Sequence, residues 1–81
     1  MNIYPVSTEK AIGLITKRNT LVFVVDENAT KRDIKDTIEK EYAVKVASVR
    51  VHRPFRGGKR AFVKLAKESN AMDLAAKLKI L

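Results

Sequence analysis

The order of apolar and polar residues predicts six elements, in the sequence helix, strand, helix, strand, strand, helix. Before the first helix, residues 1–6 end in Tyr-Pro-Val and are expected to be extended or to form a brief edge strand. Ser7 is the expected N-cap of the first helix, which ends at residues 17–19. The apolar residues of this helix recur at helical spacing: Ala11, Ile12, Leu14 and Ile15.

Two further elements follow from local signals in the middle of the chain. Residues 20–25 are a continuous β-branched and aromatic run, which is typical of an interior strand covered by a helix on at least one side. The next helix begins at a capping box, with Thr30 as N-cap and Asp33 three positions later. It is expected to run to about Tyr42. A last helix is predicted after Asn70, which is its expected cap.

Residues 44–66 predict a β-hairpin whose loop is expected at residues 53–60. Because successive strand side chains point to opposite faces, the hairpin has two different faces. The apolar face carries Ala47, Val49, Val51, Ala61, Val63 and Leu65. The other face is basic and carries Ser48, Arg50, His52, Arg60, Phe62 and Lys64.

These elements predict an α+β fold, a small two- or three-layer sandwich with a mainly antiparallel sheet. A right-handed crossover through the second helix makes the first two main strands parallel. The strand that returns from the hairpin, Arg60–Ala66, is then expected between them, in a split β-α-β arrangement. At 81 residues the chain is expected to be one domain, 1–81.

The charge of the chain indicates an anionic partner. The formal net charge is +8, from 17 Lys and Arg against 9 Asp and Glu. Between Tyr42 and Lys67 there are eight Lys and Arg and no Asp or Glu, which favours nucleic acid as the partner. The sequence has no apolar run of the roughly 20 residues that a membrane span needs and no signal-peptide pattern, so a cytoplasmic location is expected.

Catalytic and metal-binding patterns are absent from the sequence. His52 is the only histidine and has no carboxylate near it in sequence, and there is no cysteine. The Ser-x-x-Lys spacing at residues 7–10 lacks the companion motifs of acyl transferases. Phosphate-binding glycine motifs are also missing. We therefore expect no enzyme, no catalytic residue, no metal, no cofactor and no small-molecule substrate.

Two aromatic residues are candidates for stacking on unpaired RNA bases, Phe55 in the loop and Phe62 on the strand. The alternatives are a core position under another helix for Phe62 and a loop side chain folded back on the sheet for Phe55. Residues 61–65 partly match the end of the RNP1 signature of RNA-recognition motifs. Lys59, Arg60 and Leu65 depart from that signature. A free single-stranded RNA-binding module of this type is the alternative function.

An ordered series of segments carries a more extensive resemblance, from Pro5 to about Ala66. The segments are Pro5-Val-Ser-Thr-Glu-Lys10, Asn19-Thr-Leu-Val-Phe-Val-Val25, Ala29-Thr-Lys-Arg-Asp-Ile-Lys35 and Tyr42-Ala-Val-Lys-Val46. The series resembles the universal large-subunit ribosomal protein twenty-three family, and its short archaeal type most closely. The resemblance implies a structural protein of the large ribosomal subunit that binds large-subunit rRNA directly beside the polypeptide exit tunnel.

The resemblance also implies partners at the exit site. These are a neighbouring ribosomal protein twenty-nine and docking factors such as the signal recognition particle. In bacterial members the acidic residue of the Ser-Glu-Lys motif contacts the chaperone trigger factor, and Glu9 occupies that motif here. The alternative for Glu9 is an acid that stabilises a helix N-terminus. Bacterial members have a long hairpin loop that enters the tunnel, whereas residues 54–59 here are too few to reach far.

The predicted RNA-binding residues are basic residues from three segments, the second helix, the hairpin and the first helix. Lys31, Arg32 and Lys35 lie in the segment that matches the family's Ala-Thr-Lys motif. The hairpin adds Arg50, His52, Arg53, Arg56, Lys59, Arg60 and Lys64, and the first helix adds Lys10 and Arg18. Such residues bind RNA by neutralising phosphates and releasing counterions.

Overall fold

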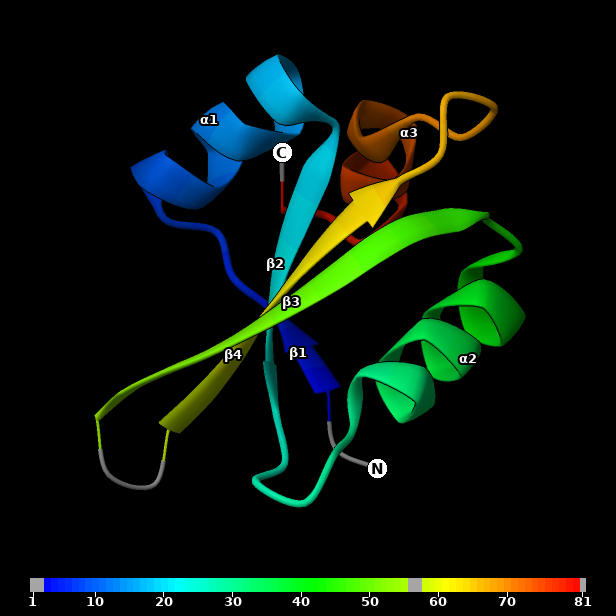
Figure 1. Ribbon diagram of the computed structural model, residues 1–81. Coiled ribbons are helices and arrows are strands. Elements are labelled where there is room, and N and C mark those ends of the chain that lie inside the picture. Colours follow the sequence, from blue (N-terminus) through cyan, green and yellow to red (C-terminus); the bar gives the residue numbers. More distant parts are fainter. Residues whose placement is uncertain (1–2, 56–57, 81) are drawn as a thin grey trace.

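The computed structural model describes residues 3–55 and 58–80, without the side chains of residues 54, 55 and 58 (Figure 1). Its elements, in chain order, are β1 (Ile3–Pro5), α1 (Glu9–Arg18), β2 (Thr20–Val25), α2 (Lys31–Tyr42), β3 (Val46–Phe55), β4 (Gly58–Leu65) and α3 (Ala71–Lys77). The four strands form one sheet in the order β1-β2-β4-β3.

The strand order confirms the predicted α+β class and the central place of the returning strand. Each pair of neighbouring strands is antiparallel, and β4 lies between β2 and β3. Because β2 and β3 are both antiparallel to β4, they run parallel to each other, as the crossover through α2 requires. The short segment at the N-terminus adds an edge strand, β1, which pairs only with the second half of β2.

The core lies on one face of this sheet, under α2 and α3. From the strands it takes alternate residues, Leu21, Phe23 and Val25 of β2 and Ala61, Val63 and Leu65 of β4. Its helical residues are Ile15, Ile34, Ile38, Ala71, Leu74 and Ala75. In Figure 1 the blue helix α1 and the green helix α2 lie on opposite sides of the strands. Helices α2 and α3 cover the core face, and α1 covers only the β2 part of the opposite face.

The caps observed at the N-termini of the helices agree with the predicted caps, except at α1. The Thr30 hydroxyl accepts from the Asp33 amide at 3.1 Å, and the Asp33 carboxylate accepts from the Thr30 amide at 3.2 Å, so the predicted capping box is confirmed. Ser7 as cap of α1 is wrong. The cap is Thr8, whose hydroxyl accepts from the Ala11 amide at 3.2 Å. The backbone of Thr8 is itself extended, with φ of −71° and ψ of 163°, so the helical conformation begins only at Glu9.

Asn19 joins three elements where α1 ends. Its backbone is left-handed, with φ of 53°, a conformation that asparagine tolerates better than most residues. Its side-chain amide donates to the carbonyls of Leu65, Ala66 and Ser69 at 3.0–3.4 Å. The Asn19 side-chain oxygen accepts from the Ala71 amide at 2.7 Å, at the start of α3. One polar side chain thus fixes α1 against the end of β4 and the start of α3.

The hairpin differs from the sequence prediction at the start of β3. Val46 pairs with Leu65 and Ser48 pairs with Lys64, so Ala47 is an extra residue in a bulge. Val46 is buried in the core and Ala47 is exposed, which contradicts the predicted apolar-face position of Ala47. A carboxylate oxygen of Glu39 accepts from the Val46 amide at 3.0 Å. The Val46 amide therefore donates to α2 and not to β4, and the pairing of β3 with β4 shifts by one residue at this point.

The predicted loop at residues 53–60 is also too long. Strand β3 continues to Phe55, and Phe55 pairs with Gly58. Pro54 lies within β3, which is possible because β3 is an edge strand whose outer amides need no partner. Arg56 lies outside the described residues, and so does the side chain of Phe55.

Candidate nucleic-acid interface

The sheet face opposite the core, called the open face below, is formed by three aligned strands. Cross-strand pairing aligns Thr20 with Lys64 and Lys64 with Ser48. The next two rows are Val22-Phe62-Arg50 and Val24-Arg60-His52. The predicted basic face of the hairpin is thus confirmed as one surface, and β2 extends it.

An aromatic ring and a guanidinium form the centre of the open face. Phe62 is half-buried, and the guanidinium carbon of Arg50 lies 5.3 Å from its ring centroid. This distance is within the range of a cation–π contact. Phe62 therefore lies on the sheet face opposite the core, and the alternative prediction of a core position is not observed.

The last row of the open face combines a cation, a histidine and exposed apolar residues. His52 pairs with Arg60, and Val24 pairs with Arg60 from the other side. Tyr4 of β1 pairs with Val24, and 60% of Tyr4 and 37% of Val24 are exposed. Aromatic and cationic side chains interleaved on an open sheet are suited to bases and phosphates.

Helix α1 lies along the β2 side of the open face and contributes to both sheet faces. Its Ile15 belongs to the main core, whereas Ala11 and Leu14 line a hollow with Val22 on the open face. Val22 is buried although it points away from the core. Helix α1 therefore covers the β2 part of the open face and leaves β3 and β4 accessible.

Three adjoining hollows follow the boundary between α1 and the sheet. The first, of about 320 Å³, contains Lys10 and Arg60, and the second, of about 470 Å³, contains Arg18, Arg50 and Lys64. Leu14 and Phe62 line both of them. The third, of about 710 Å³, shares Arg18 and Lys64 with the second. The structure thus brings Lys10 and Arg18 of the first helix together with the hairpin cations.

Sequence reasoning missed Lys17 and Lys67, which line the third hollow beside Arg18 and Lys64. Lys17 is the neighbour of Arg18 at the end of α1, and Lys67 is the last of the eight cations in the hairpin region. Both signals were present in the sequence, but only the packing of α1 beside β4 brings the two lysines together.

Two other predicted RNA-binding residues, Lys59 and Arg53, have surroundings different from those of the cations in the hollows. The Lys59 ammonium donates to the carbonyls of Glu27 and Ala29, at 3.0 and 2.6 Å. Lys59 is therefore bound to the loop that connects β2 with α2, and its position alternates with the open-face residues Arg60 and Phe62. Arg53 is exposed on β3, near the end of the hairpin.

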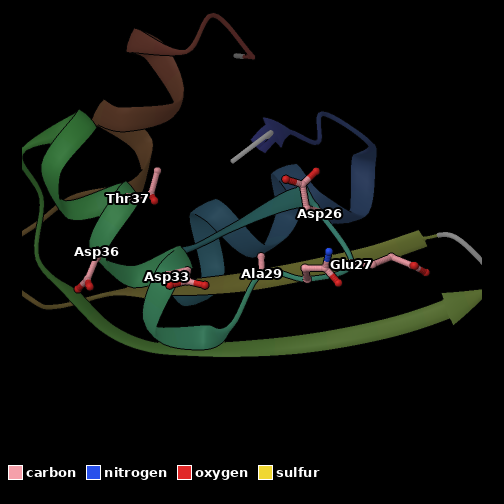
Figure 2. Close-up of a pocket in the computed structure, with 7 residues that line it drawn as sticks. Asp26, Glu27, Ala29, Asp33, Asp36 and Thr37 are labelled. Atoms are coloured by element: carbon pink, nitrogen blue, oxygen red, sulfur yellow. The ribbon is translucent and has the colours of Figure 1, made fainter.

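The cations of α2 lie apart from the open face. Lys31, Arg32 and Lys35 are exposed, but α2 packs on the core face of the sheet. Figure 2 shows the hollow beside them, with Asp26 and Glu27 after β2 and with side chains of α2. Its other acidic residues are Asp33 and Asp36. The α2 surface is therefore of mixed charge, whereas the open face is basic.

Within residues 3–55 and 58–80, no group of three or more histidine or acidic side chains is placed to hold a metal ion. No helix in that part of the chain is long and apolar enough to cross a membrane. Burial, and secondarily the charge of Glu41, raises the pKa of the Tyr42 phenol. This residue lies at the end of α2, away from the open face.

Comparison with known proteins agrees with the resemblance described above. The family model "Ribosomal protein L23" matches residues 1–74. The chain belongs to the ribosomal protein L23 family. A protein of Pyrobaculum aerophilum named "Large ribosomal subunit protein uL23" is 49% identical over 76 residues, which cover 94% of each chain. A protein of the same name from Caldivirga maquilingensis is 47% identical over 76 residues, covering 94% of this chain and 88% of its own.

The family assignment answers two questions that the sequence raised. The L23 family consists of structural ribosomal proteins, so this chain is not an enzyme. The near-complete coverage of both relatives agrees with the short type of the family. The alternative of a free RNA-recognition-like module is not favoured by these relatives.

Proposed function

We propose that this chain is a structural constituent of the large ribosomal subunit that binds large-subunit rRNA directly through its open face. As an L23 family member it acts in the cytoplasm, as part of the ribosome. The observation that carries the proposal is the charge of the three hollows beside α1. Each contains at least two Lys or Arg side chains, and no described residue that lines them is Asp or Glu.

The physical basis is neutralisation of phosphates by fixed cations. Arg50, Arg60 and Lys64 alternate with core residues on two paired strands, so the sheet holds them at a fixed spacing. Each phosphate contact releases counterions, and this release dominates the affinity of such interfaces. Ordering these cations in advance reduces the entropy lost when folded RNA binds.

The proposal includes a location beside the polypeptide exit tunnel and a part in docking nascent-chain factors. Glu9 is exposed in the first turn of α1, so its carboxylate is accessible to a partner. We propose Glu9 as a factor-facing residue, with ribosomal protein twenty-nine and the signal recognition particle as neighbours. The α2 cations Lys31, Arg32 and Lys35 and the hairpin residues Arg53, Arg56 and Lys59 remain proposed RNA contacts. The same applies to Phe55 as a stacking residue.

The first experiment compares binding of the purified protein to folded large-subunit rRNA with binding to equal masses of unrelated structured RNA and single-stranded RNA. At about 0.2 M salt, non-specific binding weakens strongly, so a preference for the folded rRNA is the expected result. Equal binding to all three RNAs would contradict the proposal. Preference for unpaired RNA that is lost in Phe62→Ala would instead favour the single-stranded module.

A matched pair of triple variants tests whether position or total charge matters. One variant changes Arg50, Arg60 and Lys64 together to Ala and removes three open-face cations. The control variant changes Lys40, Lys45 and Lys77 to Ala and removes three exposed cations elsewhere. The open-face variant should reduce the slope of log affinity against log salt by about 2–3, because each phosphate contact contributes about 0.7–0.9. The control variant should change it little. Equal losses would mean that net charge alone drives binding.

A further inference from the structure

The three hollows beside α1 are continuous because neighbours share residues. Leu14 and Phe62 line both the first and the second hollow, and Arg18 and Lys64 line both the second and the third. Thr8 lines the first hollow and Asn19 lines the third, so together they follow α1 from its N-cap to its C-cap. A helix of ten residues is about 15 Å long. The hollows thus form one groove, called the α1 groove below.

Cations occur along the whole α1 groove. The first hollow has Lys10 and Arg60, the second adds Arg50, and the third adds Lys17 and Lys67. No described residue that lines the groove is Asp or Glu. Asp33 and Asp36 lie in the separate hollow beside α2, Glu9 is the neighbour of Lys10 on α1, and Glu68 and Asp73 line another hollow between the end of α2 and α3. A groove that is cationic from end to end is suited to the phosphates of one continuous strand.

The size and chemistry of the hollows favour a single strand over a duplex surface. Its hollows have volumes of about 320, 470 and 710 Å³, which are comparable to ligand pockets of about 300–1,000 Å³. Between the first two, Leu14 and Phe62 form an apolar divider, and Val6, Ala11 and Val22 continue the apolar lining in the first hollow. Arg60 and Lys64 flank Phe62 on β4 and lie about 13 Å apart along an extended strand, a span of a few nucleotides.

We propose that a single strand of the rRNA lies in the α1 groove, with consecutive phosphates near the three sets of cations and unpaired nucleotides at the Leu14–Phe62 divider. The inference rests on the proposed rRNA binding and specifies its path across the protein. One face of the Phe62 ring is covered by Arg50, so a base at the divider stacks on the guanidinium plane or contacts the ring from the Leu14 side. Lys17 and Lys67 thereby become RNA-binding residues.

The absence of cysteine from the sequence allows a direct test of this path. Single cysteines at the exposed positions Ser7, Ser48 and Met72 place a tethered iron chelate near the first, second and third hollow. Hydroxyl radicals from the chelate cut nearby RNA in the assembled protein–rRNA complex. Asp36→Cys, on α2, is the control for a distant surface.

The expected result is that the strongest cuts from Ser7, Ser48 and Met72 fall in one continuous RNA segment, displaced by a few nucleotides in that order along the strand. Cuts from Asp36→Cys should fall elsewhere. Cuts in unconnected segments, or no cuts from the three probes while the complex still forms, would overturn the strand path. In either case binding to rRNA itself persists, so this failure is distinct from failure of the proposed function.

A second measurement addresses the third hollow. Lys17→Ala combined with Lys67→Ala should lower the slope of log affinity against log salt by about 1.5, from two phosphate contacts. The matched control is Lys40→Ala combined with Lys77→Ala, which removes the same charge from exposed positions outside the groove. Circular dichroism confirms that both variants are folded. An equal slope for the two variants would exclude Lys17 and Lys67 from the strand path.

Discussion

The guanidinium of Arg50 lies over the ring of Phe62, with its carbon 5.3 Å from the ring centroid, and the two residues pair across β3 and β4. The contact stabilises the free protein and also orders a cation at the middle of the α1 groove. Because β3 is an edge strand, this side-chain pair is also one of the contacts that hold it on β4. We therefore expect both the stability of β3 and the proposed RNA binding to depend on this pair.

The Arg50–Phe62 contact predicts a measurable coupling energy. In a double-mutant cycle with Arg50→Ala and Phe62→Leu, urea unfolding of the free protein should give a coupling of about 0.5–1 kcal/mol. Arg50→Lys retains the charge but loses the planar stacking group, so it should keep only part of this energy. Strictly additive effects of the two substitutions would show that the contact contributes nothing.

Lys59 and Lys64 lie on the same strand, β4, and substitution should mainly lower stability at Lys59 and mainly weaken rRNA binding at Lys64. Lys59→Met removes two hydrogen bonds to the carbonyls of Glu27 and Ala29, and it should lower the free energy of unfolding by about 1–2 kcal/mol. Lys64→Met removes an exposed cation of the groove and should instead weaken rRNA binding. Thermal unfolding and rRNA affinity are measured on both variants. If Lys59→Met reduced affinity more than Lys64→Met, Lys59 would be the stronger RNA contact of the two.

Asn19 provides a test of how the end of α1 is held. Asn19→Ala loses four side-chain hydrogen bonds and places a Cβ residue at φ of 53°, so it should destabilise the fold by about 2–4 kcal/mol. Asn19→Gly loses the same bonds without the backbone strain and should cost less, and urea unfolding measures both. Thr16→Ala is the control, since Thr16 is exposed on the same helix. Equal costs for Ala and Gly would show that the left-handed backbone contributes no strain.

The raised pKa of Tyr42 predicts a loss of stability at alkaline pH. Its pKa in the folded protein is raised above the usual value near 10, so the unfolded chain releases the phenolic proton first. The contribution of Tyr42 is therefore complete below pH of about 10 and is lost as the pH rises toward the folded pKa. Tyr42→Phe should unfold with a shallower pH dependence in this range than the parent protein. Identical pH profiles would show that Tyr42 titrates equally in both states.

Much of the fold could be predicted because its signals are local. The capping box of Thr30 and Asp33 and the cap at Asn70 involve residues within three positions of one another, and both are observed. The apolar run at residues 20–25 indicated an interior strand, and handedness then placed the returning strand at the centre of the sheet. The basic face of the hairpin followed from strand alternation alone.

The remaining features depend on contacts between distant segments. At the Ala47 bulge, Glu39 of α2 accepts from the Val46 amide, and no pattern within the hairpin indicates that bond. The length of β3 depends on the edge position that accommodates Pro54. Lys59 looks like any other cation in the sequence until the loop after β2 supplies two carbonyls to it.

In the candidate site, too, some features follow from the sequence and others only from the tertiary structure. Residue order alone determined that one hairpin face is basic and carries Phe62, because strand periodicity requires it. Only the tertiary structure decided that α1 lies beside that face, since Ile15 is anchored in the core and Asn19 is bonded to Ser69 and Ala71. These long-range contacts bring Lys10, Lys17 and Arg18 to the hairpin cations. The α1 groove is therefore a product of packing, which acts between residues that are far apart in the chain.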